Sequence, residues 1–289
     1  MGLPKIKRKM RIYAHCLVKN EENYLWFSVM SMIDYVDKVF IWDTGSSDKT
    51  LQIIKEIEKA RPGKIYFKEV GDVDINEFTS TRRKMLDETD SDWFILVDGD
   101  EIWWEDGIRY LISIINKNGE ELDSIVNGYI NLVGDIYHFQ DKNAAGYKID
   151  GKIGFLNIRA INKKIDGLNV AKPHGQQGFF NKDGILVQDM DKKRRRFIAK
   201  PAYLHFTNLL RSSEVFNSKV PKRKMKFKYE LGKSLPLDFY YPEIFFKPRP
   251  EIVPNLWVAR NNSYLFRATL ETPLKVFKRK FLPKPNPGY

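Results

Sequence analysis

The chain has 289 residues, of which 43% are hydrophobic and 30% charged, a balance typical of a soluble globular protein with a substantial core. No apolar run approaches the roughly 18 residues that a membrane-spanning helix needs, and the basic residues 1–11 lack the apolar core of a signal peptide. The single cysteine, Cys16, excludes an intrachain disulfide, so we expect a cytoplasmic protein in which Cys16 is buried and inert.

The charge is divided unevenly along the chain. Residues 1–150 carry a net charge of −7, and residues 151–289 carry a net charge of +19. A basic half indicates an anionic partner, which could be nucleic acid, anionic lipid headgroups or a phosphorylated substrate. General solubility is the plainer alternative.

The first third of the chain alternates between apolar strands and amphipathic helices. The strands are predicted at 11–18, 37–42, 64–70 and 93–97, and the helices at about 20–32, 48–59 and 76–88. This βαβαβαβ order predicts an α/β fold in which a mostly parallel sheet has helices on both faces.

The regular alternation fades after about residue 120. Residues 125–133 and 153–161 are expected to be strands in a mixed extension of the sheet. From residue 192 the chain is rich in basic, aromatic and proline residues, which indicates short elements and loops. We expect an amphipathic helix within 257–281 and an extended or disordered end at 282–289.

The fourth strand ends abruptly in three carboxylates: Asp98, Asp100 and Glu101. Open α/β sheets bind ligands beyond the carboxyl ends of their strands, so these side chains should face a ligand. Three negative charges crowd together unfavourably unless a cation such as Mg²⁺ or Mn²⁺ joins them. An acidic turn without a ligand is the alternative.

Polar residues also follow the other three predicted strands, at 19–22, at 43–46, and at Asp72 or Asp74. One sugar-nucleotide pocket at the edge of the sheet would explain all of them together. The glycine motif of a dinucleotide-binding domain, the P-loop and the covalent hydrolase motifs are missing.

Four motifs in this order resemble those of a family 2 glycosyltransferase with the GT-A fold. The runs are HCLVKNEE at 15–22, YVDKVFIWDTGSSDKT at 35–50, FTSTRR at 78–83 and WFILVDGDE at 93–101. The resemblance is strong over residues 11–105 and weakens beyond 120. It implies a metal-dependent hexosyltransferase that uses a nucleoside diphosphate sugar, UDP-hexose in the first place. An inverting transfer is expected, and the residues leave a retaining transfer open as the alternative.

The resemblance also implies roles for individual residues. Glu21 and Asp43 would contact the base and ribose of the nucleotide, and Arg82 would orient the uracil or the diphosphate. Asp98 would face the ribose or the metal, and Asp100 would ligate Mn²⁺ or Mg²⁺.

Three of these residues have simpler explanations. Glu21 could serve only the electrostatics of a helix N-terminus, and Asp43 could cap a turn. Either Arg82 or Arg83 is expected to be a surface charge, and the resemblance favours Arg82 as the ligand contact.

Two histidines and several acids remain as catalytic candidates. His205 could complete the metal shell, whereas His174 lies in a glycine-flanked loop where related enzymes often carry a His-Glu pair, although Gly175 follows it here. An inverting transferase needs a carboxylate base. The candidates are Glu101, Asp150, Asp183, Asp189 and Asp191.

We predict a GT-A domain at 1–215, with a nucleotide-sugar half at about 11–120 and an acceptor half at 121–215, followed by an irregular basic extension at 216–289. The basic clusters at 192–196 and 222–228 could form a solvated face, a diphosphate clamp or a landing surface on anionic membrane.

The acceptor is expected to be a hydroxyl of a cell-envelope glycan or of a lipid-linked molecule. A peripheral position on the inner face of the membrane would suit a lipid-linked acceptor. A nucleotidyltransferase is disfavoured because residues 19–22 contain no glycine, and a basic nucleic-acid-binding protein is disfavoured because no motif supports it.

Overall fold

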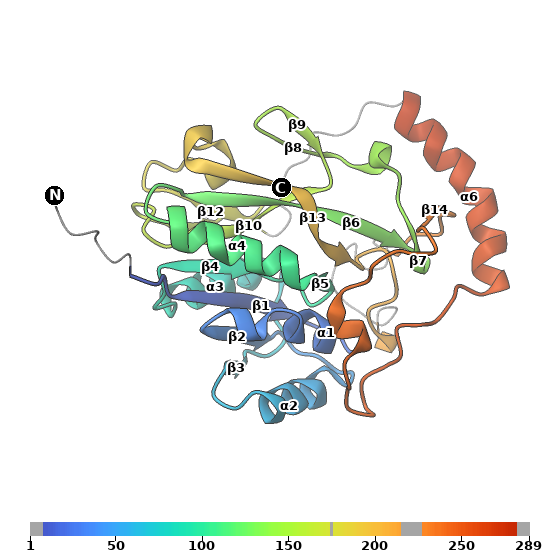
Figure 1. The fold of residues 1–289 in the computed structure, drawn as a ribbon, viewed down its shortest axis with the longest axis horizontal. Helices are drawn as coiled ribbons and strands as arrows, with labels where there is room; N and C mark the ends of the chain where they lie inside the picture. Colours follow the sequence, from blue (N-terminus) through green and yellow to red (C-terminus); the bar gives the residue numbers. More distant parts are fainter. Residues whose placement is uncertain (1–7, 174–175, 215–226, 282–289) are drawn as a thin grey trace.

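The protein, seen here as a computed structural model, is described over residues 8–173, 176–214 and 227–281 (Figure 1). Its first third alternates between strands and helices as predicted, in the order β1 (Ile12–Val18), α1 (Leu25–Met30), β2 (Lys38–Asp43), α2 (Thr50–Ala60), β3 (Ile65–Glu69), α3 (Ile75–Asp87) and β4 (Trp93–Leu96). Helix α1 is shorter than predicted because Asn20 has a left-handed backbone (φ 52°), which turns the chain after β1.

The rest of the chain adds strands more often than helices. Its elements are β5 (Glu101–Trp103), α4 (Glu105–Asn118), β6 (Ser124–Val133), β7 (Asp135–Phe139), β8 (Tyr147–Ile149), β9 (Lys152–Gly154), β10 (Leu156–Asn162), β11 (Asn169–Ala171), β12 (Gly178–Phe180), β13 (Arg195–His205), β14 (Lys233–Ser234) and α6 (Asn262–Phe281). The predicted strand at 153–161 is confirmed over 156–161, where β10 enters the main sheet, whereas its first residues belong to β9, which pairs with β8 in a separate hairpin.

The main sheet has the strand order β14-β7-β6-β10-β4-β1-β2-β3, and β13 joins it by pairing with β6 and β5. Strands β3, β2, β1 and β4 are parallel to their neighbours in this group, whereas β10 runs antiparallel between β4 and β6. The sheet therefore has a parallel half and a mixed half, as the sequence predicts.

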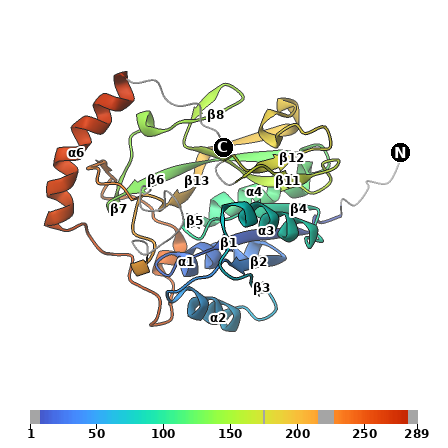
Figure 2. The same cartoon turned by 180° about the vertical axis from the view of Figure 1, so that it is seen from behind.

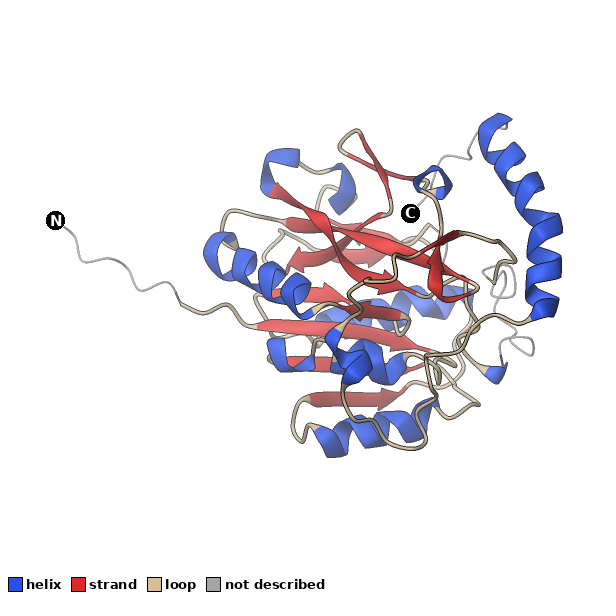
Figure 3. Ribbon diagram, turned by 45° about the vertical axis from the view of Figure 1, so that its right-hand side comes forward, coloured by secondary structure: helices blue, strands red, loops and turns tan. Residues whose placement is uncertain are grey.

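Helices cover both faces of this sheet (Figure 3). Alternate residues of β1, from Ile12 to Val18, pack with α1, α2 and α4 on the face nearer the viewer in Figure 1. Tyr13 faces the opposite way, toward Met85 of α3, which is nearer the viewer in Figure 2. Cys16 is buried in this core, as predicted. The predicted α/β class is confirmed.

The C-terminal part runs along one end of the sheet. Ile244 and Phe245 join the main core, where Phe245 contacts Phe27 of α1 with 6.0 Å between ring centroids. Helix α6 (Asn262–Phe281) lies within the predicted range 257–281, and residues 282–289 lie outside the described residues.

None of the helices in the described ranges has the length and apolar character needed to cross a membrane.

Candidate active site

Loops that follow parallel strands meet at one edge of the sheet. The register pairs Val18 at the end of β1 with Asp43 at the end of β2, and Val97, directly after β4, donates its N–H to β1 (3.0 Å). The side-chain oxygen of Asn20 accepts the N–H of Ser47 (2.7 Å), which ties the first two loops together. The carboxyl ends of β1, β2 and β4 therefore lie at the same edge of the sheet, which is where α/β sheets bind ligands.

A tight turn after β4 carries the three carboxylates. The N–H of Glu101 donates to the carbonyl of Asp98 (3.1 Å), so the chain reverses and starts β5. A Cβ on Gly99 would lie 2.9 Å from Cγ of Glu21, so glycine is needed where the Glu21 side chain crosses this turn. Glu21 and the acidic turn are thus in contact.

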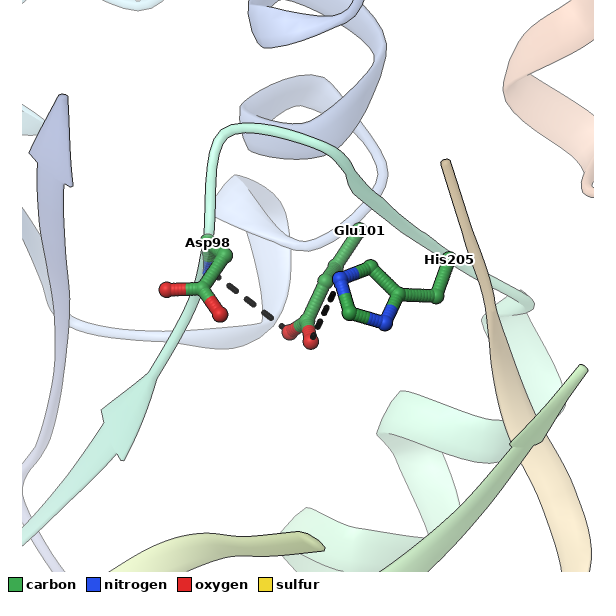
Figure 4. Close-up of side chains that lie close together, drawn as sticks. All are labelled: Asp98, Glu101 and His205. Atoms are coloured by element: carbon green, nitrogen blue, oxygen red, sulfur yellow. Dashed lines mark hydrogen bonds and ion pairs between the residues drawn. The ribbon is translucent and has the colours of Figure 1, made fainter. Parts of the chain in front are cut away.

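His205 reaches the turn because β13 pairs antiparallel with β5, which places it opposite Glu101. Figure 4 shows Asp98, Glu101 and His205 pointing toward one another, and one ligand atom from each lies within 4.8 Å of the others. Nδ1 of His205 is buried and finds no hydrogen-bond partner within the described ranges, whereas Nε2 faces Oε1 of Glu101 at 4.0 Å. Two carboxylates and an imidazole fit Mn²⁺ or Mg²⁺.

Asp100 lies next to this group of three and is fully buried. Its Oδ1 is 3.6 Å from Nε2 of His205, and its Oδ2 is 3.3 Å from Nη1 of Arg211. The two oxygens of the Asp100 carboxylate thus face different residues, one a histidine and the other an arginine. The role of Asp100 as a metal ligand stays a prediction.

Arg159 of β10 was missed by the sequence analysis, yet it occupies the centre of the acidic cluster. Its Nη2 donates to Oδ2 of Asp98 (2.9 Å) and to Oε1 of Glu101, and its Nε donates to the hydroxyl of Tyr203 (3.2 Å). Burial raises the pKa of Glu101 well above its ordinary value, although the charge of Arg159 opposes the shift. Burial also opposes the ionisation of Asp98, but the positive charges of Arg159, Arg82 and His205 together keep the pKa of Asp98 below its ordinary value.

Arg211 is a second residue that the sequence did not reveal. Its Nη1 lies 2.7 Å from Oε1 of Glu21 and 3.3 Å from Oδ2 of Asp100. Two further hydrogen bonds join the main chain around Arg211 to the loop after β1. Asn23 donates its N–H to the carbonyl of Arg211 (3.1 Å), and Ser213 donates its N–H to the Glu22 carboxylate (2.8 Å). The segment after β13 thus closes over the loop after β1.

Asp43 does cap a turn. Its Oδ2 accepts the N–H groups of Gly45 and Ser46 (both 2.9 Å), and its Oδ1 accepts the Ser46 hydroxyl. A carboxylate has about four acceptor positions, so a nucleotide contact remains open to it. Asp72, after β3, forms an ion pair with Lys19, which brings the third predicted strand end to the same edge.

The two arginines of α3, Arg82 and Arg83, differ in their hydrogen bonds, and the sequence analysis favours Arg82 as the ligand contact. Arg83 donates to the carbonyl of Val170 through Nε (3.0 Å) and Nη2 (2.5 Å). Arg82 is partly buried beside Phe78, and its Nε has no hydrogen-bond partner among residues 8–173, 176–214 and 227–281. Arg82 therefore has its Nε donor left for a ligand, whereas Arg83 uses its Nε and Nη2 on Val170.

Several remaining candidates lie far from this edge. Asp150 pairs with Arg195 at the start of β13 (2.5 Å), and Asp191 caps the short turn at 192–194. Arg195 and His205 lie opposite Ser124 and Asn131 of β6, seven strand residues apart, which is about 23 Å. The cluster 192–196 is thus too distant to clamp a diphosphate beside His205. His174 and residues 222–226 lie outside the described residues.

Comparisons with known proteins agree with this arrangement. A family model described as glycosyl transferase family 2 matches residues 17–182, more than half of the chain, and no curated protein matches the sequence. The crystal structure of S. aureus TarS 1-349 in complex with UDP-GlcNAc is similar at 13% identity and a TM-score of 0.50, covering 70% of this chain and 60% of that one. The mannosyltransferase PcManGT from Pyrobaculum calidifontis, in complex with GDP-Man and Mn²⁺, is 12% identical with a TM-score of 0.43, covering 69% and 58%. The chain spans less than two thirds of either of these proteins. The predicted GT-A fold is confirmed.

Proposed function

The chain belongs to glycosyl transferase family 2, and we propose that it transfers a hexose from a nucleoside diphosphate, UDP in the first place, to an acceptor hydroxyl. The observation that carries the proposal is the set of Asp98, Glu101 and His205, which lies at the carboxyl edge of the parallel strands with ligand atoms within 4.8 Å. This is the edge at which α/β sheets bind nucleotides.

Mn²⁺ or Mg²⁺ would be held by Asp98, Glu101 and His205, with Asp100 as a further candidate. Such a cation would bridge the diphosphate and neutralise the charge that develops on the leaving group. Four carboxyl groups gather here, those of Glu21, Asp98, Asp100 and Glu101, and Arg159 and Arg211 pair with them. A divalent cation would add positive charge where these carboxyl groups meet.

The proposal also includes roles for the residues around the metal site. Arg82 would bind the diphosphate through its free donors, while Asp43 and Glu21 would shape the nucleoside end of the site. Glu101 has no exposed surface and is paired with Arg159, so holding the metal suits it better than taking a proton from the acceptor. The Asp98 side chain is 44% exposed, which makes it the accessible carboxylate of the turn.

The acceptor would be a glycan or a lipid-linked molecule, and the transfer would invert the anomeric centre. The half at about 11–120 would bind the donor, because its loops supply Glu21, Asp43, Arg82 and the acidic turn. The half at 121–215, which supplies Arg159, His205 and Arg211, would bind the acceptor. Residues 216–289 would form the extension.

The test measures binding and turnover separately. Titration calorimetry with UDP or GDP, each with and without Mn²⁺, gives the metal-dependent affinity, and a panel of nucleotide sugars gives the rate of nucleotide release. We expect Asp98→Asn and His205→Ala to lower the metal-dependent affinity about 10-fold or more and kcat by about 100-fold or more. Asp100→Ala shows whether this fourth residue ligates the metal.

The matched control is Asp106→Asn, since Asp106 is an exposed acid of α4 paired with Lys200. It should behave like the wild type in both assays. Full nucleotide release by Asp98→Asn with a chelator present would contradict the metal role, and the absence of binding to any nucleoside diphosphate would contradict the donor assignment.

A further inference from the structure

Helix α6 has one strongly apolar face that points away from the protein. Its members are between 59% and 72% exposed, and we call them the outer stripe: Phe266, Leu270, Leu274, Phe277 and Phe281. Their spacing along the helix places all five within an arc of about 80°. An exposed apolar strip of this kind usually marks a site of interaction.

The opposite face of α6 is polar and holds the helix to the protein. The hydroxyl of Thr272 accepts the N–H of Leu231 (3.0 Å), and Lys275 donates to the carbonyl of Tyr229 (2.5 Å). Arg279 forms two hydrogen bonds with the Glu230 carboxylate (2.6 and 2.7 Å). An ordinary amphipathic helix buries its apolar stripe and exposes its polar side. Here the orientation is reversed, so the stripe is not part of the protein's own core.

The start of α6 is anchored beside the end of β6. Gly134, the residue after β6, has φ +82°, and a Cβ there would lie 2.9 Å from the ring of Tyr264. The N–H of Arg260 donates to Oδ2 of Asp135 (3.1 Å). Figures 1 and 2 both show α6 on the side of the molecule toward which β6 and β13 point. Since β13 ends at His205, the outer stripe and the candidate active site lie on the same side.

We propose that the outer stripe of α6 docks onto the surface of an anionic lipid bilayer. Phenylalanine and leucine side chains on one face of a helix that also carries many basic residues are typical of interfacial helices. Residues 262–281 contain five Lys and Arg residues against one Glu; Arg267 and Lys275 pair with Glu271 and Arg279 pairs with Glu230, while Lys278 and Lys280 are exposed. Residues 151–289 carry a net charge of +19. This charge attracts anionic headgroups, whereas it would repel the same helix of a second copy.

The proposal goes beyond the transferase activity, because binding to lipid needs neither donor nor metal. It bears on the acceptor, because a bilayer held at α6 would present lipid-linked hydroxyls to the side of the molecule that carries the acidic turn.

Vesicle flotation tests the proposal with the full chain. One set of vesicles contains phosphatidylcholine alone, and in the other part of the lipid is replaced by phosphatidylglycerol. We expect binding to the anionic vesicles that weakens as salt is added, and little binding to the neutral ones. The double variant Leu274→Glu with Phe277→Glu should lower the partition coefficient for anionic vesicles at least about tenfold.

The matched control is Tyr110→Glu with Ile153→Glu, which changes two exposed apolar residues outside α6 and should bind as the wild type does. Circular dichroism should show the same thermal unfolding for all three proteins, because every altered side chain is exposed. Wild-type protein that ignores anionic vesicles, or a stripe variant that binds as well as the control, would overturn the proposal. A dimer that the stripe variant dissociates, with no lipid binding by the wild type, would instead assign the stripe to a second copy.

Discussion

Arg159 contacts two of the residues that would hold the proposed divalent cation. The guanidinium group contacts both Asp98 and Glu101, which are also two of the three residues that could hold the metal. A buried carboxylate without a counter-charge is costly, so the arginine stabilises the cluster when no cation is bound. Protein stability and metal affinity should therefore be coupled through this one side chain.

Replacing Arg159 by methionine should reveal this coupling. We expect Arg159→Met to lower the free energy of unfolding by about 3 kcal/mol in the presence of a chelator, because the fully buried Glu101 and the partly exposed Asp98 lose their common partner. Adding Mn²⁺ should then raise the melting temperature of the variant more than that of the wild type, as thermal unfolding with and without the ion would show.

Arg109→Met is the control for this experiment. Arg109 is an exposed arginine of α4, 3.5 Å from Glu105, and its loss should change the stability by less than about 0.5 kcal/mol. Equal stability of Arg159→Met and the wild type in chelator would show that the cluster does not depend on the guanidinium group.

At the scale of elements, the position of α6 depends on one turn of the main chain. Gly134 links β6 to β7 in a left-handed conformation, and the ring of Tyr264 packs against the place where a side chain would begin. The Tyr264 hydroxyl in turn donates to the carbonyl of Lys228 (2.7 Å). This contact connects the helix, the end of β6 and the segment that follows residue 226.

Gly134→Ala should therefore destabilise the protein by about 2 kcal/mol, because the added methyl group meets Tyr264 and the backbone conformation is strained. Urea unfolding would measure the loss, and hydrogen exchange should show it concentrated in α6. Gly146→Ala is the matched control, since nothing lies within 4 Å of the added atom there. The same loss of stability for both variants would refute the role given to the Gly134 contact.

For the whole molecule, the main core extends across the predicted domain boundary at residue 215. Ile244 and Phe245 lie in the same core as α1 and β13, although the sequence places them in the C-terminal extension. Phe246, the next residue, is 66% exposed. The two positions carry the same type of residue, and only one of them is buried. Comparing substitutions at Phe245 and Phe246 therefore measures how much core packing contributes to stability.

Phe245→Ala should lower the free energy of unfolding by about 3 kcal/mol, whereas Phe246→Ala should change it by less than about 0.5 kcal/mol. Calorimetry should also show one unfolding transition for the wild type, because the core is continuous. Two separate transitions, or similar effects of the two substitutions, would instead favour an extension that folds independently of residues 1–215.

The sequence was sufficient for the features that depend on neighbouring residues. The periodicity of β1 to β4 and the polar residues after each strand are local, and parallel strands bring their carboxyl ends to one edge. Glu21, Asp98 and Glu101 can therefore be recognised as site candidates in the sequence, whereas His205 is suggested by the resemblance to GT-A enzymes; the fold brings all four together at that edge.

Only the tertiary structure could reveal Arg159 and Arg211, because each meets its carboxylate partners across long stretches of chain: Arg211 is 190 residues from Glu21, and Arg159 is 61 residues from Asp98. No local pattern distinguishes these arginines from the many basic residues around them. The amphipathic character of α6 is likewise present in the sequence, but its orientation is not. Periodicity shows that a helix has an apolar face, and only packing against the rest of the protein decides whether that face is buried or left open.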